Sequence, residues 1–169
     1  MQLLIVRHAI AADQLEWAAT GCPDDQRPLT GKGRARMKRN AAGIVAALPH
    51  LDVIGTSPFT RAAQTAELLA RAYRGVEVVE VPALASGGSR DQLLNWLETC
   101  DSDAGVAVVG HEPDLGWLVA WLLGGDGVSA VAMRKGGACL LDFVGYPSPG
   151  RAELKWFLPP SLLRRLDPS

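Results

Sequence analysis

The pair Arg7-His8 is the first feature of the sequence that could do chemistry. It follows an apolar run at residues 3–6 that is typical of a buried β-strand. A neutral histidine ring can attack phosphorus, and an arginine beside it stabilises the charge that develops on the phosphoryl oxygens. Arg-His pairs are also common on solvated strand ends, so the function of this pair depends on partners elsewhere in the chain.

Two further predicted strands end at residues that suit a phosphoryl group. Arg61 lies five residues after a short buried strand at 53–56, and His111 lies two residues after an apolar strand at 105–109. Ligands of open α/β sheets bind beyond the carboxyl ends of parallel strands, so the three strand ends can converge on one pocket. Because guanidinium groups match phosphate oxygens in pairs, such a pocket would be a compact receptor for a dianion.

The elements that must position these residues alternate along the chain. Apolar residues at helical spacing predict helices after Thr30, after Pro58, after Ser89 and after Pro113, each following a predicted strand or loop. Two strands at 138–144 and 152–157 complete the pattern as a hairpin, whereas residues 11–29 are predicted to form a long loop. This order predicts a three-layer α/β/α sandwich with a mostly parallel central sheet, folded as a single domain over residues 1–169.

The composition argues against several classes of protein. A formal net charge of −1 gives no support for nucleic acid or a membrane as a partner. Cys22, Cys100 and Cys139 are far apart and form no CxxC pair, which argues against a disulfide framework and a zinc site. No apolar stretch approaches the ~20 residues that span a bilayer, and the first predicted strand begins too early for a removable leader. We therefore expect a cytoplasmic protein with no metal and no cofactor.

The chain resembles the histidine phosphatase superfamily, whose fold is phosphoglycerate-mutase-like. Within that superfamily, the segments Arg27-Pro28-Leu29-Thr30 and Ser57-Pro58-Phe59-Thr60-Arg61-Ala62 look like those of SixA-type phosphohistidine phosphatases. The resemblance implies that His8 is the nucleophile and becomes transiently phosphorylated. It also implies that Arg7, Arg61 and His111 bind the phosphoryl oxygens and that water releases the phosphate. One position departs from the family pattern, because the usual Arg-His-Gly reads Arg7-His8-Ala9 here.

The proton donor for the leaving group is not evident from the sequence. In many superfamily members that cleave phosphate esters, a glutamate lies in the segment that here spans residues 82–88 and contains no acid. An alkoxide leaves poorly without a proton, whereas the imidazole of phosphohistidine leaves far more easily, so this absence favours a phosphoramidate substrate. Glu112 and Asp91 are candidate acids, although Glu112 could equally cap the following helix, where an acid suits the helix dipole.

These observations together predict a metal-independent phosphatase that acts on phosphohistidine in a protein, such as a histidine-phosphorylated domain. The alternatives are a phosphatase of small phosphate esters, with Glu112 as the acid, and a catalytically silent module that binds phosphorylated ligands. Arg27 is a further candidate for the border of the pocket. The run of Lys and Arg between residues 32 and 39 is either a solvated face or a basic rim that steers an acidic protein partner.

Overall fold

A computed structural model describes residues 1–126 and 131–168 of the chain. One six-stranded sheet runs through this part of the chain, in the order β3-β2-β4-β1-β5-β6. Its strands are β1 (Gln2–Arg7), β2 (Val53–Thr56), β3 (Glu77–Glu80), β4 (Gly105–Gly110), β5 (Ala138–Asp142) and β6 (Glu153–Leu158). The α-helices are α1 (Gln14–Ala18), α2 (Gly31–Ala47), α3 (Thr60–Ala72), α4 (Arg90–Leu97), α5 (Asp114–Gly124) and α6 (Pro160–Leu166). Two 3-10 turns, η1 (Asp24–Gln26) and η2 (Pro82–Leu84), lie between them.

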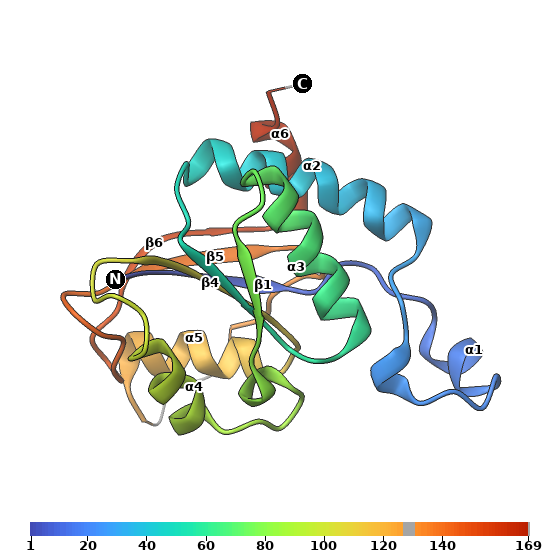
Figure 1. Ribbon diagram of the computed structural model, residues 1–169, viewed down its shortest axis with the longest axis horizontal. Helices are drawn as coiled ribbons and strands as arrows, with labels where there is room; N and C mark the ends of the chain where they lie inside the picture. Colours follow the sequence, from blue (N-terminus) through green and yellow to red (C-terminus); the bar gives the residue numbers. More distant parts are fainter. Residues whose placement is uncertain (127–130, 169) are drawn as a thin grey trace.

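Helices cover both faces of the sheet, as the sequence pattern predicts. Figure 1 shows α2, α3 and α6 on one face and α4 and α5 on the other. Successive side chains of a strand point to opposite faces, so Leu4 and Val6 of β1 pack under α2 and α3, while Leu3 and Ile5 pack against α4 and α5. All four side chains are fully buried, which is why this strand reads as a continuous apolar run. None of the helices of the described residues is both long and apolar enough to cross a membrane.

The direction of the strands explains why the carboxyl ends of several of them lie at the same edge of the sheet. β3, β2, β4 and β1 are neighbours and run parallel, whereas β5 and β6 run antiparallel to their neighbours. The sheet is therefore mostly parallel and has the mixed architecture of the phosphoglycerate-mutase-like fold. Because β1, β2 and β4 run the same way side by side, their carboxyl ends lie at one edge of the sheet.

Two segments differ from the expectation drawn from the sequence. Residues 11–29 are not one long loop, because they contain α1, capped by the Asp13 carboxylate, and the turn η1. No helix is predicted from the sequence after β6, where α6 begins at a pair of prolines. α6 packs on α2, and Gly43 is the point of closest approach, since a Cβ there would lie 1.9 Å from the Leu163 carbonyl oxygen. Such a short helix depends on this tertiary contact rather than on its own periodicity.

Candidate active site

The two histidines are brought together by the register of the parallel strands. Arg7, the last residue of β1, stands opposite Gly110, the last residue of β4, so His8 and His111 follow a matched pair. Their ring centroids lie 5.2 Å apart. β2 ends at Thr56, opposite Val109, which places Ser57 beside the same two strand ends. The structure therefore assembles all three strand ends singled out in the sequence at one site.

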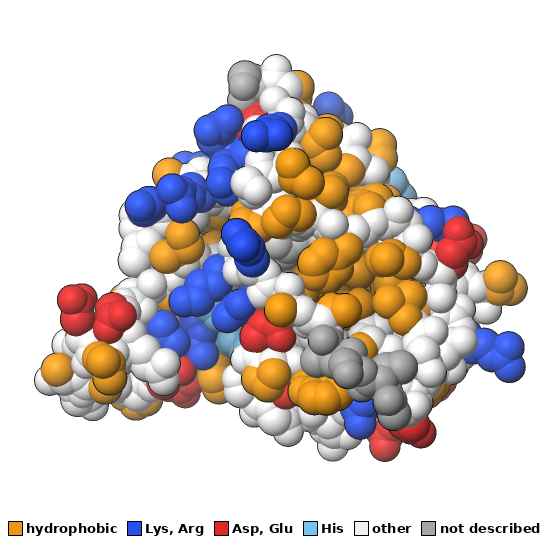
Figure 2. All heavy atoms as spheres, turned by 180° about the vertical axis from the view of Figure 1, so that it is seen from behind, with side chains coloured by type: hydrophobic (Ala, Val, Ile, Leu, Met, Phe, Trp, Pro, Cys, Tyr) orange, Lys and Arg blue, Asp and Glu red, His pale blue; other side chains and the backbone are white. Residues whose placement is uncertain are grey.

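A pocket of about 650 Å³ lies at this edge of the sheet. It is lined by Arg7, His8, Ile10, Ala11, Ala12, Asp13, Gln14, Asp24, Arg27, Arg61, Ser86, His111, Glu112 and Lys135. Figure 2 shows the pocket as a hollow in which Lys and Arg side chains surround a histidine. The pocket thus contains every residue for which the sequence predicts a role in phosphoryl binding, together with Arg27 and Glu112. Asp91 is exposed on α4 and does not line it.

His8 is 5% exposed, and one of its ring nitrogens is committed to the backbone. Its Nδ1 lies 2.7 Å from the carbonyl oxygen of Ala9. A carbonyl oxygen only accepts hydrogen bonds, so Nδ1 carries the proton and the lone pair of the neutral ring lies on Nε2. Burial lowers the pKa of His8 to about 3; the Ala9 hydrogen bond acts against this shift, while His111, Arg61 and Arg7 add to it. At neutral pH the ring is therefore uncharged, as a nucleophile requires.

His111 is held by its opposite nitrogen. Its Nε2 lies 2.8 Å from the hydroxyl oxygen of Ser57, which already accepts a hydrogen bond from the backbone of Phe59. With the Ser57 hydroxyl as the donor to Nε2, the ring proton of neutral His111 lies on Nδ1. Nδ1 is buried and has no partner among the described atoms. Burial, with Arg61 as the next contribution, lowers the pKa of His111 to about 4, so the ring is neutral before a substrate binds.

The arginines are fixed in place by groups that leave part of each guanidinium available. Arg7 Nη1 donates to the Met133 carbonyl at 2.7 Å. Arg61 Nη1 donates to the Asp24 carbonyl at 2.7 Å, and its Nη2 pairs with the Asp24 carboxylate at 3.0 Å. Arg27 Nε donates to the other Asp24 oxygen at 2.8 Å. The Nε atoms of Arg7 and Arg61 are buried and have no hydrogen-bond partner among the described atoms.

Glu112 lines the pocket, but one of its oxygens has a structural role. Glu112 Oε1 accepts from the Met133 backbone N–H at 2.6 Å, while Arg7 donates to the carbonyl of the same residue. Burial lowers the pKa of Arg7, and the charge of Glu112 acts against that shift. Glu112 thus fixes the loop that Arg7 contacts. This arrangement gives the residue a positioning role next to its possible role as an acid.

Comparison with known proteins places the chain in a family. The family model of the histidine phosphatase superfamily (branch 1) matches residues 3–86. The phosphohistidine phosphatase SixA of Escherichia coli is 32% identical over 129 residues, which cover 75% of this chain and 76% of SixA. The chain belongs to the histidine phosphatase superfamily. An uncharacterized protein of Picosynechococcus sp. is 37% identical over 169 residues, which cover 94% of this chain and the whole of that protein.

Solved structures of the superfamily share the fold. The structure of the protein histidine phosphatase SixA complexed with tungstate has a TM-score of 0.76 at 26% identity and covers 96% of this chain and 99% of that one. A phosphoserine phosphatase mutant from Entamoeba histolytica, complexed with phosphoserine, has a TM-score of 0.68 at 17% identity, covering 94% and 97%. The second likeness concerns the fold alone, since superfamily members with different substrates share it.

Ala9, which replaces the glycine usual in the superfamily, fits without backbone strain. Arg74 is the one non-glycine residue with a positive φ in the described chain, so Ala9 does not occupy the conformation that would favour glycine. Its methyl group is buried in the core, its N–H donates to Thr65 Oγ1 at 3.0 Å, and its carbonyl holds His8. The substitution therefore preserves each backbone contact of the nucleophile.

Sequence reasoning assigned no role to four residues that organise the site. Asp24 joins two arginines, Ser57 holds His111, Thr65 joins Ala9 to the carbonyl of Arg61, and Lys135 lies at the rim. Ser57 lies within the segment 57–62 that the sequence pattern marks, and Thr65 follows it. Their polar side chains beside this motif were the signal in the sequence, and the structure shows that both are buried. Asp24 and Lys135 come from loops whose positions the sequence pattern does not define.

Proposed function

We propose that this protein is a phosphohistidine phosphatase that removes the phosphoryl group from phosphohistidine in a protein, without a metal and with His8 as the nucleophile. The hydrogen bond from His8 Nδ1 to Ala9 carries the proposal, because it leaves the Nε2 lone pair free in a pocket with three arginines. A module that only bound phosphate would not require a neutral, oriented histidine there.

The proposed reaction has two displacements at phosphorus. His8 Nε2 attacks phosphorus and forms a P–N bond, while the P–N bond to the substrate imidazole breaks and the imidazole leaves with the electron pair and takes up a proton from solvent. Water then attacks the phosphoryl group on His8 and gives up a proton to solvent. The P–N bond to His8 breaks, inorganic phosphate is released, and the Nε2 lone pair is restored. Arg7 and Arg61 stabilise the charge on the phosphoryl oxygens in both steps.

His111 is proposed to donate a hydrogen bond from Nδ1 to a phosphoryl oxygen. The low pKa of His111 arises mainly from burial and from the charge of Arg61. A bound phosphoryl dianion is an opposite charge, which favours the protonated ring, so substrate binding raises this pKa. The protonated ring then donates a stronger hydrogen bond to the phosphoryl oxygen than the neutral ring of the free enzyme would.

The absence of an acid from residues 82–88, which include η2, supports phosphohistidine over a phosphate ester. Ser86, which follows η2, lines the pocket. It belongs to the segment in which, by the family resemblance, many ester-cleaving members carry a glutamate. Burial raises the pKa of Asp24, but the hydrogen bond from Arg27 and the charge of Arg61 outweigh this, and its pKa lies below the ordinary value. Asp24 therefore stays ionised, so it pairs with the arginines and does not protonate a leaving oxygen. The similarity to SixA of Escherichia coli points to the same substrate class.

A substrate panel in the presence of EDTA tests the proposal. Phosphoramidate and a phosphohistidine peptide should be hydrolysed faster than a phosphoserine peptide, because only the alkoxide of the alkyl ester needs strong acid assistance to leave. His8→Ala should abolish phosphate release. His50→Ala is the matched control, since the His50 side chain is 79% exposed and pairs with Asp52 away from the pocket.

Faster turnover of the ester would instead indicate a small-molecule phosphatase with Glu112 as acid. Binding of phosphorylated peptide without any phosphate release would identify a silent binding module. Retained turnover in His8→Ala would overturn the assignment of the nucleophile.

A further inference from the structure

A second hollow opens beside the catalytic pocket, and three cations line it. Arg36 of α2, Lys135 of the loop before β5 and Arg164 of α6 face this space of about 50 Å³, together with the buried side chain of Asn40. Lys135 and Ile10 line both this hollow and the catalytic pocket. The two spaces are therefore neighbours on the surface. We call Arg36, Lys135 and Arg164 the basic band.

Like charges are crowded in the basic band. Burial lowers the pKa of Arg164, and the charges of Arg36 and Arg39 lower it further. The pKa of Lys135 is lowered by burial and then by the three arginines of the catalytic pocket, against a smaller opposing effect of Asp13. Within the described residues, neither Arg36 nor Lys135 forms an ion pair. An anion that entered the hollow would relieve this repulsion.

The loop that carries Lys135 is anchored on both sides. Asn40 Nδ2 donates to the Gly136 carbonyl at 2.9 Å, and the Gly136 N–H lies 3.1 Å from the carbonyl oxygens of both Arg7 and His8. Gly136 adopts a φ of 76°, which favours glycine and turns the chain there. Arg164 Nη1 in turn donates to Asn40 Oδ1 at 3.1 Å. These contacts hold the backbone next to Lys135 and the guanidinium of Arg164 at fixed positions relative to the nucleophile.

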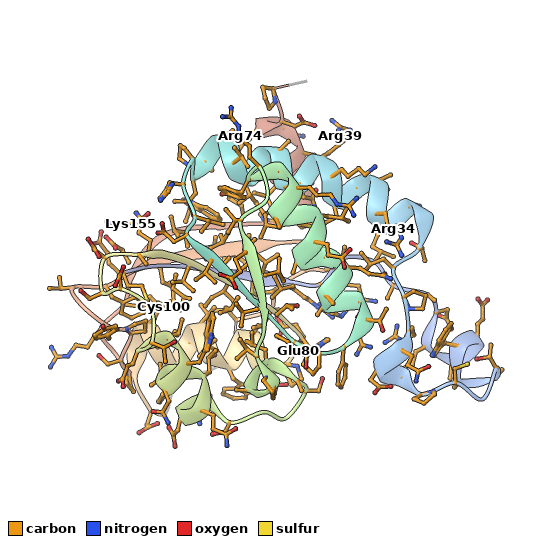
Figure 3. All side chains as sticks on the ribbon, viewed as in Figure 1. Arg34, Arg39, Arg74, Glu80, Cys100 and Lys155 are labelled. Atoms are coloured by element: carbon orange, nitrogen blue, oxygen red, sulfur yellow. The ribbon has the colours of Figure 1, made fainter. Side chains whose placement is uncertain are left out.

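The cations of this face contrast with the net charge of the whole chain, which is −1. Figure 2 shows Lys and Arg side chains from the hollow with the histidine up to the corner formed by α2 and α6. Figure 3 shows Arg34 and Arg39 along α2, while the labelled acid Glu80 lies on the edge strand β3. Arg36 and Arg39 of α2 act on Arg164 as like charges, although Arg39 also pairs with Asp167. Together with Lys135 they create a local positive field that attracts an acidic surface.

We propose that the basic band docks acidic side chains that flank the phosphohistidine on the protein substrate. The axes of packed helices lie about 8–10 Å apart, so a band that crosses from α6 to α2 and on to the pocket rim is broader than a small phosphorylated metabolite. Arg36 and Lys135 are also exposed, as contact with another protein surface requires. This inference rests on the proposed function and names the surface of the substrate that the site selects.

Two phosphohistidine peptides of equal length test the docking surface, one with glutamates and one with glutamines on both sides of the phosphohistidine. At low ionic strength, kcat/KM of the wild type should be about tenfold higher for the glutamate peptide, because opposite charges speed association. The preference should shrink as salt is added, since about 0.1 M salt screens charges beyond ~10 Å. Arg36→Glu should reduce the ratio of the two kcat/KM values to about one or below.

Arg151→Glu is the matched control and should keep the wild-type ratio. Arg151 is exposed and lies in the connection between β5 and β6. Because Asp142 at the end of β5 pairs with Gln2 at the start of β1, this connection lies at the end of the sheet opposite Arg7. Equal rates on both peptides in the wild type, or a preference that survives in Arg36→Glu, would overturn the docking surface and leave the proposed function intact.

Failure to hydrolyse either peptide would overturn the proposed function instead. Binding of the unphosphorylated glutamate peptide to the wild type and to Arg36→Glu then decides the docking surface separately. Binding weakened about tenfold in the variant would support the docking surface, and equal binding would refute it.

Discussion

The two histidines of the site come from neighbouring parallel strands and occupy matching positions, yet their surroundings differ. His8 donates from Nδ1 to the backbone of the next residue, whereas His111 is held at Nε2 by the side chain of Ser57. Nε2 is thus left free in the first ring and Nδ1 in the second. Both rings are almost completely buried and both have lowered pKa values.

We expect the hydrogen-bond neighbour of each histidine, rather than its position at a strand end, to determine its role. A carbonyl oxygen can only accept, so it fixes one tautomer of His8 and leaves a lone pair for attack. A hydroxyl can donate, so it favours a His111 ring that presents an N–H to a phosphoryl oxygen. The comparison predicts a nucleophile and a stabilising donor from two residues of the same type.

The largest difference should appear when each histidine is replaced by glutamine. His8→Gln removes the nucleophile, and we expect kcat to fall by at least about 10⁴-fold, as for nucleophiles of other covalent mechanisms. No phosphoenzyme should be trapped from radiolabelled phosphoramidate by a rapid alkaline quench, which preserves the acid-labile P–N bond. A trapped phosphoenzyme in this variant would place the nucleophile at another residue and break the comparison.

His111→Gln should be milder, because it removes a donor and not the bond-forming atom. We expect kcat to fall about 10²–10³-fold, the usual effect of losing one donor to a developing charge. The phosphoenzyme should still form, only more slowly, in single-turnover experiments. Complete absence of the phosphoenzyme, with the fold intact by circular dichroism, would contradict the assigned role.

The lowered pKa values predict a loss of stability in mild acid. The native pKa of His8 is about 3 and the unfolded value is about 6.5, so the unfolded state takes up protons first as the pH falls. Stability is therefore complete above pH 6.5 and declines below it, by roughly 2 kcal/mol per buried histidine between pH 7 and pH 5. Urea unfolding at several pH values measures this decline.

Replacement of one buried histidine should remove its share of the pH dependence. His8→Asn is expected to lose about half of the decline between pH 7 and pH 5, because His111 still contributes the remainder. His50→Ala should retain the full decline, since His50 is exposed. An unchanged decline in His8→Asn would show that His8 is not buried as a neutral ring.

Ser57→Ala should have the smallest of these effects. The variant leaves His111 in place but removes the hydroxyl that selects its tautomer, so we expect kcat to fall about tenfold, the cost of one hydrogen bond to a partly charged group. The pH profile of kcat should shift with it, and Ser57→Thr should restore both if the hydroxyl alone is needed. A drop in stability with unchanged kcat and pH profile would assign Ser57 a purely structural role.

Much of the fold follows directly from the amino-acid pattern. The buried strands β1 and β4, the helix capped by Thr30 and the final hairpin all lie where apolar spacing and capping residues predict them. α1 and α6 could not be predicted in the same way, because they have only five and seven residues. α1 buries none of its residues and is capped locally by Asp13, whereas α6 packs on the distant helix α2.

The sequence by itself determined which strand ends carry Arg7, His8, Arg61 and His111, because the parallel arrangement brings these ends to one edge. Only the tertiary structure decided which nitrogen of each histidine is held, which acid joins Arg27 to Arg61, and where Lys135 stands. Those partners belong to backbone carbonyls and loop residues, whose positions are fixed by long-range hydrogen bonds such as Asn40 to Gly136. Local periodicity carries no signal for such contacts.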